Sequence, residues 1–84
     1  STLDDLAFSL RMVIRAHGVS DADTLATQLS EYLQSNDGWR FNEALKRTVK
    51  TKLYSMILPV LPESQKTHVK TIADELLRMH AITA

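Results

Sequence analysis

Apolar residues recur at intervals of three and four in four successive segments of this chain, and this spacing restricts its fold more than any other feature. Because an α-helix has about 3.6 residues per turn, side chains three and four apart lie on one face of it. No segment shows the alternating pattern of a half-buried strand. In the first segment, over about residues 3–17, the recurring positions are Leu3, Leu6, Leu10, Val13, Ile14 and His17.

Three further segments repeat this spacing, over about residues 20–35, from Trp39 to about Ile57, and from Pro62 towards the end of the chain. Gly18 is expected to end the first helix, since glycine tolerates the left-handed conformation of a helix end. Pro59 is expected to end the third, because the residue before a proline avoids helical geometry.

The middle positions of these stripes are expected to form the core. This set comprises Leu10, Val13, Leu29, Val49, Leu53, Ile72 and Leu76. The stripe of the third helix also contains Phe41, which is therefore expected to point inward. Trp39 is expected to cap the end of the core. The apolar connector 58–62 is expected to close one end of the bundle, with an exposed docking element as the alternative.

The length of 84 residues suits a single domain, residues 1–84, with one core. An apolar content of 44% and a charged content of 24% are typical of a globular domain. Four helices with short connections predict an all-α fold, a compact four-helix bundle. The up-down antiparallel arrangement is favoured, and an orthogonal arrangement is the alternative.

The lack of cysteine favours the cytoplasm or another reducing intracellular compartment, because small secreted domains usually depend on disulfides. No stretch approaches the roughly 20 apolar residues that a membrane span needs, so no membrane partner is expected. The two glycines do not form a phosphate-binding loop, and no two histidines have the spacing of a zinc-binding pair. We therefore expect no enzyme, no catalytic residue, no metal and no cofactor.

The first helix carries a second apolar stripe, formed by Phe8, Met12 and Ala16. Its members are spaced by four and lie nearly opposite Leu6 and Leu10. If the stripe is exposed, these residues are candidates for a partner-binding surface. Self-association of two copies would be the simplest way to cover it. The alternative is that the first helix sits centrally and is covered on both sides.

Charge is distributed unevenly, although the net charge is zero. Residues 1–38 hold six acidic and two basic residues, whereas residues 39–70 hold seven basic and two acidic ones. In the third helix, a possible nucleic-acid-binding face consists of Arg40, Lys46, Arg47 and Lys50. The alternative is a solvated face paired with acids of the first two helices. The leading functional hypothesis is a protein–protein interaction or regulatory adaptor domain, with homodimerisation through the first helix as one form of it. The second hypothesis is a nucleic-acid-binding regulator that uses the basic face of the third helix.

Overall fold

Four α-helices make up most of the chain and are joined by a turn between the first two and by short 3-10 helices between the others. The computed structural model describes the backbone of residues 2–83 and the side chains of residues 3–81. Within the described backbone there is no strand, so the predicted all-α four-helix fold is confirmed. The helices are α1 (Thr2–Ala16), α2 (Ala22–Ser35), α3 (Glu43–Ile57) and α4 (Val69–Thr83), and the 3-10 helices are η1 (Asp37–Phe41), η2 (Leu58–Val60) and η3 (Glu63–His68).

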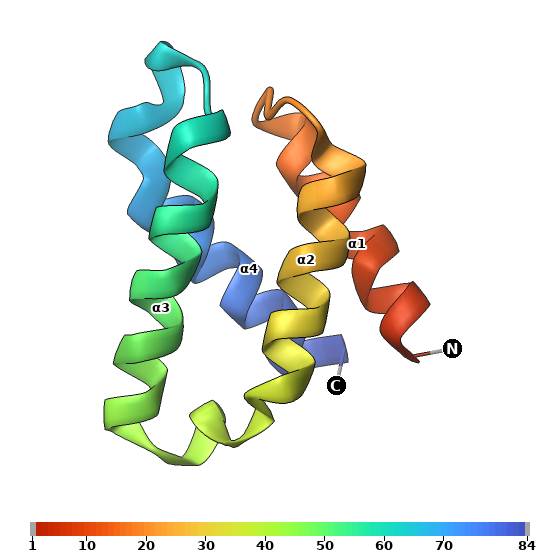
Figure 1. Cartoon of the computed structure of the whole chain (residues 1–84), viewed down its shortest axis with the longest axis vertical. Helices are drawn as coiled ribbons and strands as arrows, with labels where there is room; N and C mark the ends of the chain where they lie inside the picture. The colour runs from red at the N-terminus through yellow and green to blue at the C-terminus, as the bar shows by residue number, and fades with distance from the viewer. Residues whose placement is uncertain (1, 84) are drawn as a thin grey trace.

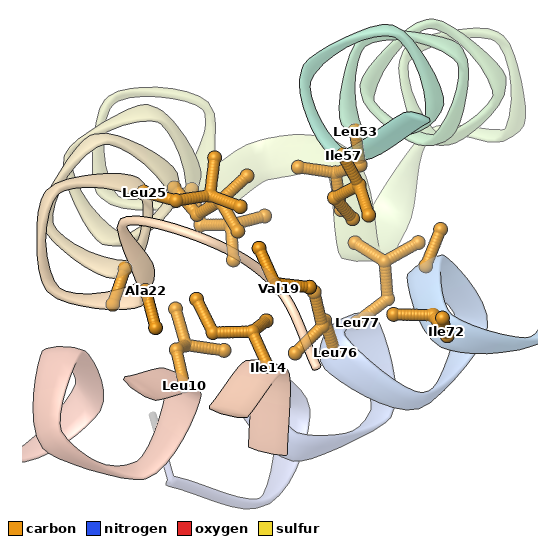
Figure 2. Close-up of a cluster of buried hydrophobic side chains, with 14 of the residues drawn as sticks. Leu10, Ile14, Val19, Ala22, Leu25, Leu53, Ile57, Ile72, Leu76 and Leu77 are labelled. Carbon is orange, nitrogen blue, oxygen red and sulfur yellow. The ribbon is translucent and has the colours of Figure 1, made fainter. Parts of the chain in front are cut away.

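The helices surround a single cluster of aliphatic side chains. Figure 1 shows α1 beside α2, α3 on the other side of α2, and α4 crossing behind them obliquely. Leu10 and Ile14 of α1 point toward a cluster that also holds Leu53 of α3 and Leu76 of α4 (Figure 2). Six of the seven predicted core residues are buried, and Val13 is half-buried against the cluster.

The turn between α1 and α2 requires two left-handed residues. Gly18 has a φ of 76°, and its N–H donates to the carbonyl of Arg15 at 2.9 Å, which ends α1 as predicted. Asp21 has a φ of 53° and immediately precedes α2. The second helix therefore begins at Ala22, two residues later than the sequence indicated, because the chain reverses through Asp21 first.

The third helix does not begin at Trp39. Instead η1 covers Asp37–Phe41, and α3 starts after Asn42, whose side chain accepts a hydrogen bond from the N–H of Leu45 at 3.0 Å. This capping break changes the direction of the chain, so helical spacing does not extend across it. As a result Phe41, expected in the core, is 90% exposed, whereas Trp39 is buried as predicted.

The connector between α3 and α4 closes one end of the bundle. Leu61 is buried in the core, and the N–H of Ser20 donates to the carbonyl of Val60 at 3.4 Å. The segment after Pro62 was predicted to be α-helical, but it forms η3, as in the bond of 2.8 Å from the N–H of Gln65 to the carbonyl of Pro62. The α-helix α4 therefore begins only at Val69. None of the helices that the structure describes is long and apolar enough to cross a membrane.

Candidate interaction surfaces

The outer face of α1, defined by Phe8, Met12 and Ala16, is exposed. Phe8 and Met12 are 55% and 52% exposed, although both are large apolar side chains. On the opposite side of the same helix, Leu6 and Leu10 are at most 1% exposed. The structure therefore places the three predicted partner-binding residues together on one accessible strip.

The neighbours of α1 explain this exposure. It contacts α2 most extensively and α4 next, and both lie on the side of its buried leucines. The alternative of a central helix covered on both sides is therefore wrong. The guanidinium of Arg11 lies 5.1 Å from the ring centre of Phe8, a cation–π contact along one margin of the strip.

Charges of opposite sign lie at the two ends of α1. Asp4 and Asp5 occupy its first turn, where the helix dipole favours negative charge. Near the other end, Asp23 of α2 accepts a hydrogen bond from Arg15 at 2.9 Å and lies 3.6 Å from Arg11. Because two arginines share this one carboxylate, the C-terminal end of the strip keeps a positive charge.

The outer face of α3 is basic, but it does not include all four predicted residues. Arg40 lies in η1, where it forms an ion pair of 3.0 Å with Asp37 and donates to the carbonyl of His80 at 3.4 Å. The capping break at Asn42 therefore separates Arg40 from Lys46, Arg47 and Lys50, which lie on α3 itself.

The cations of α3 are not neutralised by acids of α1 or α2. Lys50 pairs with Asp74 of α4 at 2.9 Å, and this hydrogen bond raises the pKa of Lys50 above its ordinary value. Lys46 and Arg47 form no ion pair with any residue that the structure describes. The ion pairs expected between this face and the acidic residues of α1 and α2 are therefore not among those that the described residues form.

Two hollows flank α3 and extend the basic surface. The hollow between α3 and α4 has a volume of about 280 Å³ and is lined by Trp39, Lys46, Lys50, Asp74, Leu77, Arg78 and Ala81. A wider one of about 490 Å³, next to α2, is lined by Tyr32, Arg47, Thr48, Thr51, Lys52 and Ser55. The predicted face left out Arg78, which lies on α4, and Lys52, which lies on α3 but about 140° around the helix from Arg47. Assigning residues to one helix face does not show which other residues line the same hollow.

The end of α4 packs against η1 in a polar corner. His80 is fully buried, its ring centre lies 5.9 Å from that of Trp39, and its Nε2 lies 3.4 Å from a carboxylate oxygen of Asp37. Burial is the main cause that lowers the pKa of His80 below its ordinary value. Away from this corner, Nε2 of His17 lies 3.3 Å from a carboxylate oxygen of Glu75.

This corner has the properties of a packing contact. His80 is one of the largest fully buried side chains, and the Trp39 indole N–H has no hydrogen-bond partner among the described residues. Within the described part of the chain, no group of three or more His, Cys, Asp or Glu side chains could hold a metal ion. Most of the predicted binding residues lie instead on the exposed outer faces of α1 and α3.

Comparison with known proteins gives this chain no family: no protein-family model, no curated protein and no solved structure matches it.

Proposed function

We propose that this chain is a protein–protein interaction domain, of the regulatory adaptor type, that binds its partner through the outer face of α1. The observation that carries the proposal is the exposure of Phe8 and Met12 on a helix whose opposite face buries Leu6, Leu10 and Ile14. The cysteine-free composition supports a location in the cytoplasm or another reducing compartment.

Exposed apolar residues of this size are favourable contacts for a partner. Fully burying an exposed Phe or Met side chain contributes roughly 1.5–3 kcal/mol, and about half of that is available here because Phe8 and Met12 are about half exposed. Phe8 and Met12 are one turn apart, and Ala16 leaves room for close approach of another backbone at the next turn. The fixed backbone of α1 presents them without an ordering cost, which favours association.

The test uses a photo-crosslinking side chain placed at Met12 while the chain is in its cell of origin. The proposal predicts a covalent adduct with a protein when Met12 is replaced, and loss of that adduct when Phe8→Glu is added. A matched control places the same crosslinker at Thr51, which is also exposed but lies on α3. The absence of any protein adduct from position 12, or an equal yield from position 51, would overturn the proposal.

Nucleic-acid binding by α3 is the second candidate function. Lys46 and Arg47 are free of ion pairs within the described residues, and Arg78 lines the same hollow as Lys46. Side chains of this kind bind phosphates, and such binding weakens steeply as salt rises. The neutral net charge and the ion pair at Lys50 make this the weaker of the two candidates.

The second candidate is tested by fluorescence anisotropy with a labelled single-stranded oligonucleotide. Binding at low salt that falls linearly on a log–log plot against salt, and that is lost in the double variant Lys46→Glu and Arg47→Glu, would support it. Phe8→Ser is the control and should bind as the parent does. A parent that binds no oligonucleotide at low salt would end this candidate.

A further inference from the structure

The charges around the outer face of α1 are arranged so that the face complements itself when it is turned end for end. At about 100° per residue, Asp5 and Met12 lie roughly 60° and 40° from Phe8 on one side, and Arg15 lies roughly 20° away on the other. All four are exposed. Along the helix the strip therefore presents an acidic, an aromatic, a thioether and a basic side chain, in that order.

We propose that the partner covering this face is a second copy of the same chain, packed through α1 in antiparallel orientation about a two-fold axis. The proposal rests on the protein-binding role proposed above and names its partner. In this arrangement Phe8 packs on Met12 of the partner subunit, and Asp5 lies opposite Arg15 of the partner subunit. The two-fold axis repeats each of these contacts once.

The orientation follows from electrostatics. A parallel pair of α1 helices would place Asp5 against Asp5 of the partner subunit and Arg15 against Arg15 of the partner subunit, which repel each other. The antiparallel pair brings opposite charges together at both ends. Arg15 now contacts Asp23, but Arg11 also lies within 3.6 Å of that carboxylate and keeps it neutralised when Arg15 turns to the partner.

The antiparallel arrangement predicts a result that a folding defect in either charge variant could not produce. In a homodimer of Asp5→Arg, two arginines oppose each other at both ends, and in a homodimer of Arg15→Asp, two aspartates do so. A mixed dimer of the two variants has an Arg opposite an Asp at both ends. Since an exposed ion pair changes affinity by a factor of about 1.5–5, each single variant should dimerise about tenfold more weakly than the parent. The mixture should recover the parental affinity.

Sedimentation velocity over about 1 µM to 1 mM measures these affinities. Phe8→Ser should weaken the parental dimer about tenfold or more, because it removes the aromatic contact. The matched control is Phe41→Ser, an equally drastic change at a 90% exposed phenylalanine in η1, away from α1. That variant should dimerise like the parent.

The outcomes separate this inference from the proposed function. Recovery of the dimer only on mixing would support the antiparallel arrangement. A parent that dimerises but is indifferent to both charge variants would overturn it. A parent that stays monomeric throughout would overturn the choice of a second copy, whereas an adduct from position 12 with a different protein would still support the binding role of α1. Loss of both the dimer and the adduct would remove both proposals.

Discussion

The two helices α1 and α3 have equal lengths and similar inner faces, but their outer faces differ. Each has 15 residues, and each places three nearly inaccessible aliphatic side chains in the core. Outside, α1 presents Phe8 and Met12, whereas α3 presents Lys46 and Arg47. Folding imposes the same requirement on both inner faces and none on the outer ones. The difference between the helices is therefore where binding specificity is expected.

The residues that pack against the two helices also differ. Aliphatic contacts dominate beneath α1, while the N-terminal end of α3 follows η1, whose Trp39 packs against His80. Within the described residues, a fully buried titratable ring contacts a carboxylate in this second region, whereas His17, which follows α1 and contacts Glu75, is only half-buried. The α3 side of the molecule should therefore respond to acid, and the α1 side should respond to loss of apolar surface.

The largest expected effect tests whether the inner faces are equivalent. Leu10→Ala in α1 and Leu53→Ala in α3 each remove a fully buried side chain, and each should lower the free energy of unfolding by about 2–5 kcal/mol. Urea unfolding followed by circular dichroism measures both. If one variant were as stable as the parent, the corresponding helix would not be part of the common core.

Substitutions on the outer faces should separate the two helices. Phe8→Glu should weaken association of the chain about tenfold or more while changing the free energy of unfolding by less than about 1 kcal/mol, because its side chain is already half in water. Analytical ultracentrifugation and urea unfolding give the two quantities. The double variant Lys46→Glu and Arg47→Glu is the counterpart and should leave association intact. Unfolding of the chain by Phe8→Glu would show that the stripe belongs to the core.

Acid should lower the stability of the polar corner in which the end of α4 packs against η1. Because burial lowers the pKa of His80, the unfolded chain takes up this proton more readily than the folded one. The contribution of His80 to stability is therefore constant above its ordinary pKa of about 6.5 and decreases as pH falls below it, by at most about 1.4 kcal/mol per pH unit.

Urea unfolding at pH 7.5 and at pH 5.5, read by fluorescence of the single tryptophan, tests this dependence. The variant His80→Leu should be less sensitive to acid, whereas His68→Asn, a change at an exposed histidine, should retain the parental sensitivity. If His80→Leu lost as much unfolding free energy between pH 7.5 and pH 5.5 as the parent does, groups other than His80 would be responsible for the acid response.

The smallest effect concerns the ion pairs beside the outer face of α1. Asp23→Asn removes the shared partner of Arg11 and Arg15, but all three side chains are substantially exposed. Such pairs contribute about 0.2–1 kcal/mol each and are screened by salt. Unfolding measured at low and high salt should show a small difference that disappears at high salt. A loss above about 2 kcal/mol would mean that these pairs hold α1 in place.

Local pattern was sufficient for the number and approximate positions of the four helices and for most of the core, but not for where α3 and α4 begin. Leu29, Val49, Leu53, Ile72 and Leu76 could be identified because a residue in the middle of an apolar stripe is buried wherever the helix packs. The pattern wrongly predicted that Phe41 points inward, because Phe41 continues the spacing of α3 but precedes its N-cap at Asn42. Periodicity does not show where a capping side chain interrupts the helix.

The candidate surfaces depended more on tertiary structure. The second stripe of α1 could be read from the spacing of Phe8, Met12 and Ala16, but not whether a neighbour covers it. Similarly, the basic residues of α3 could be identified, but the pairing of Lys50 with Asp74 and the contribution of Arg78 could not. Contacts between residues distant in the chain require the relative placement of helices, which short-range spacing does not encode.

The sequence by itself determined that this chain forms four amphipathic helices around an aliphatic core, because helical spacing and chain-reversing residues act locally. Only the tertiary structure decided that α1 lies at the side of the molecule with Phe8 and Met12 in solvent (Figure 1). The physical reason is that a helix buries whichever stripe its neighbours can cover. Since α2 and α4 cover the same side of α1, its second stripe is left in solvent.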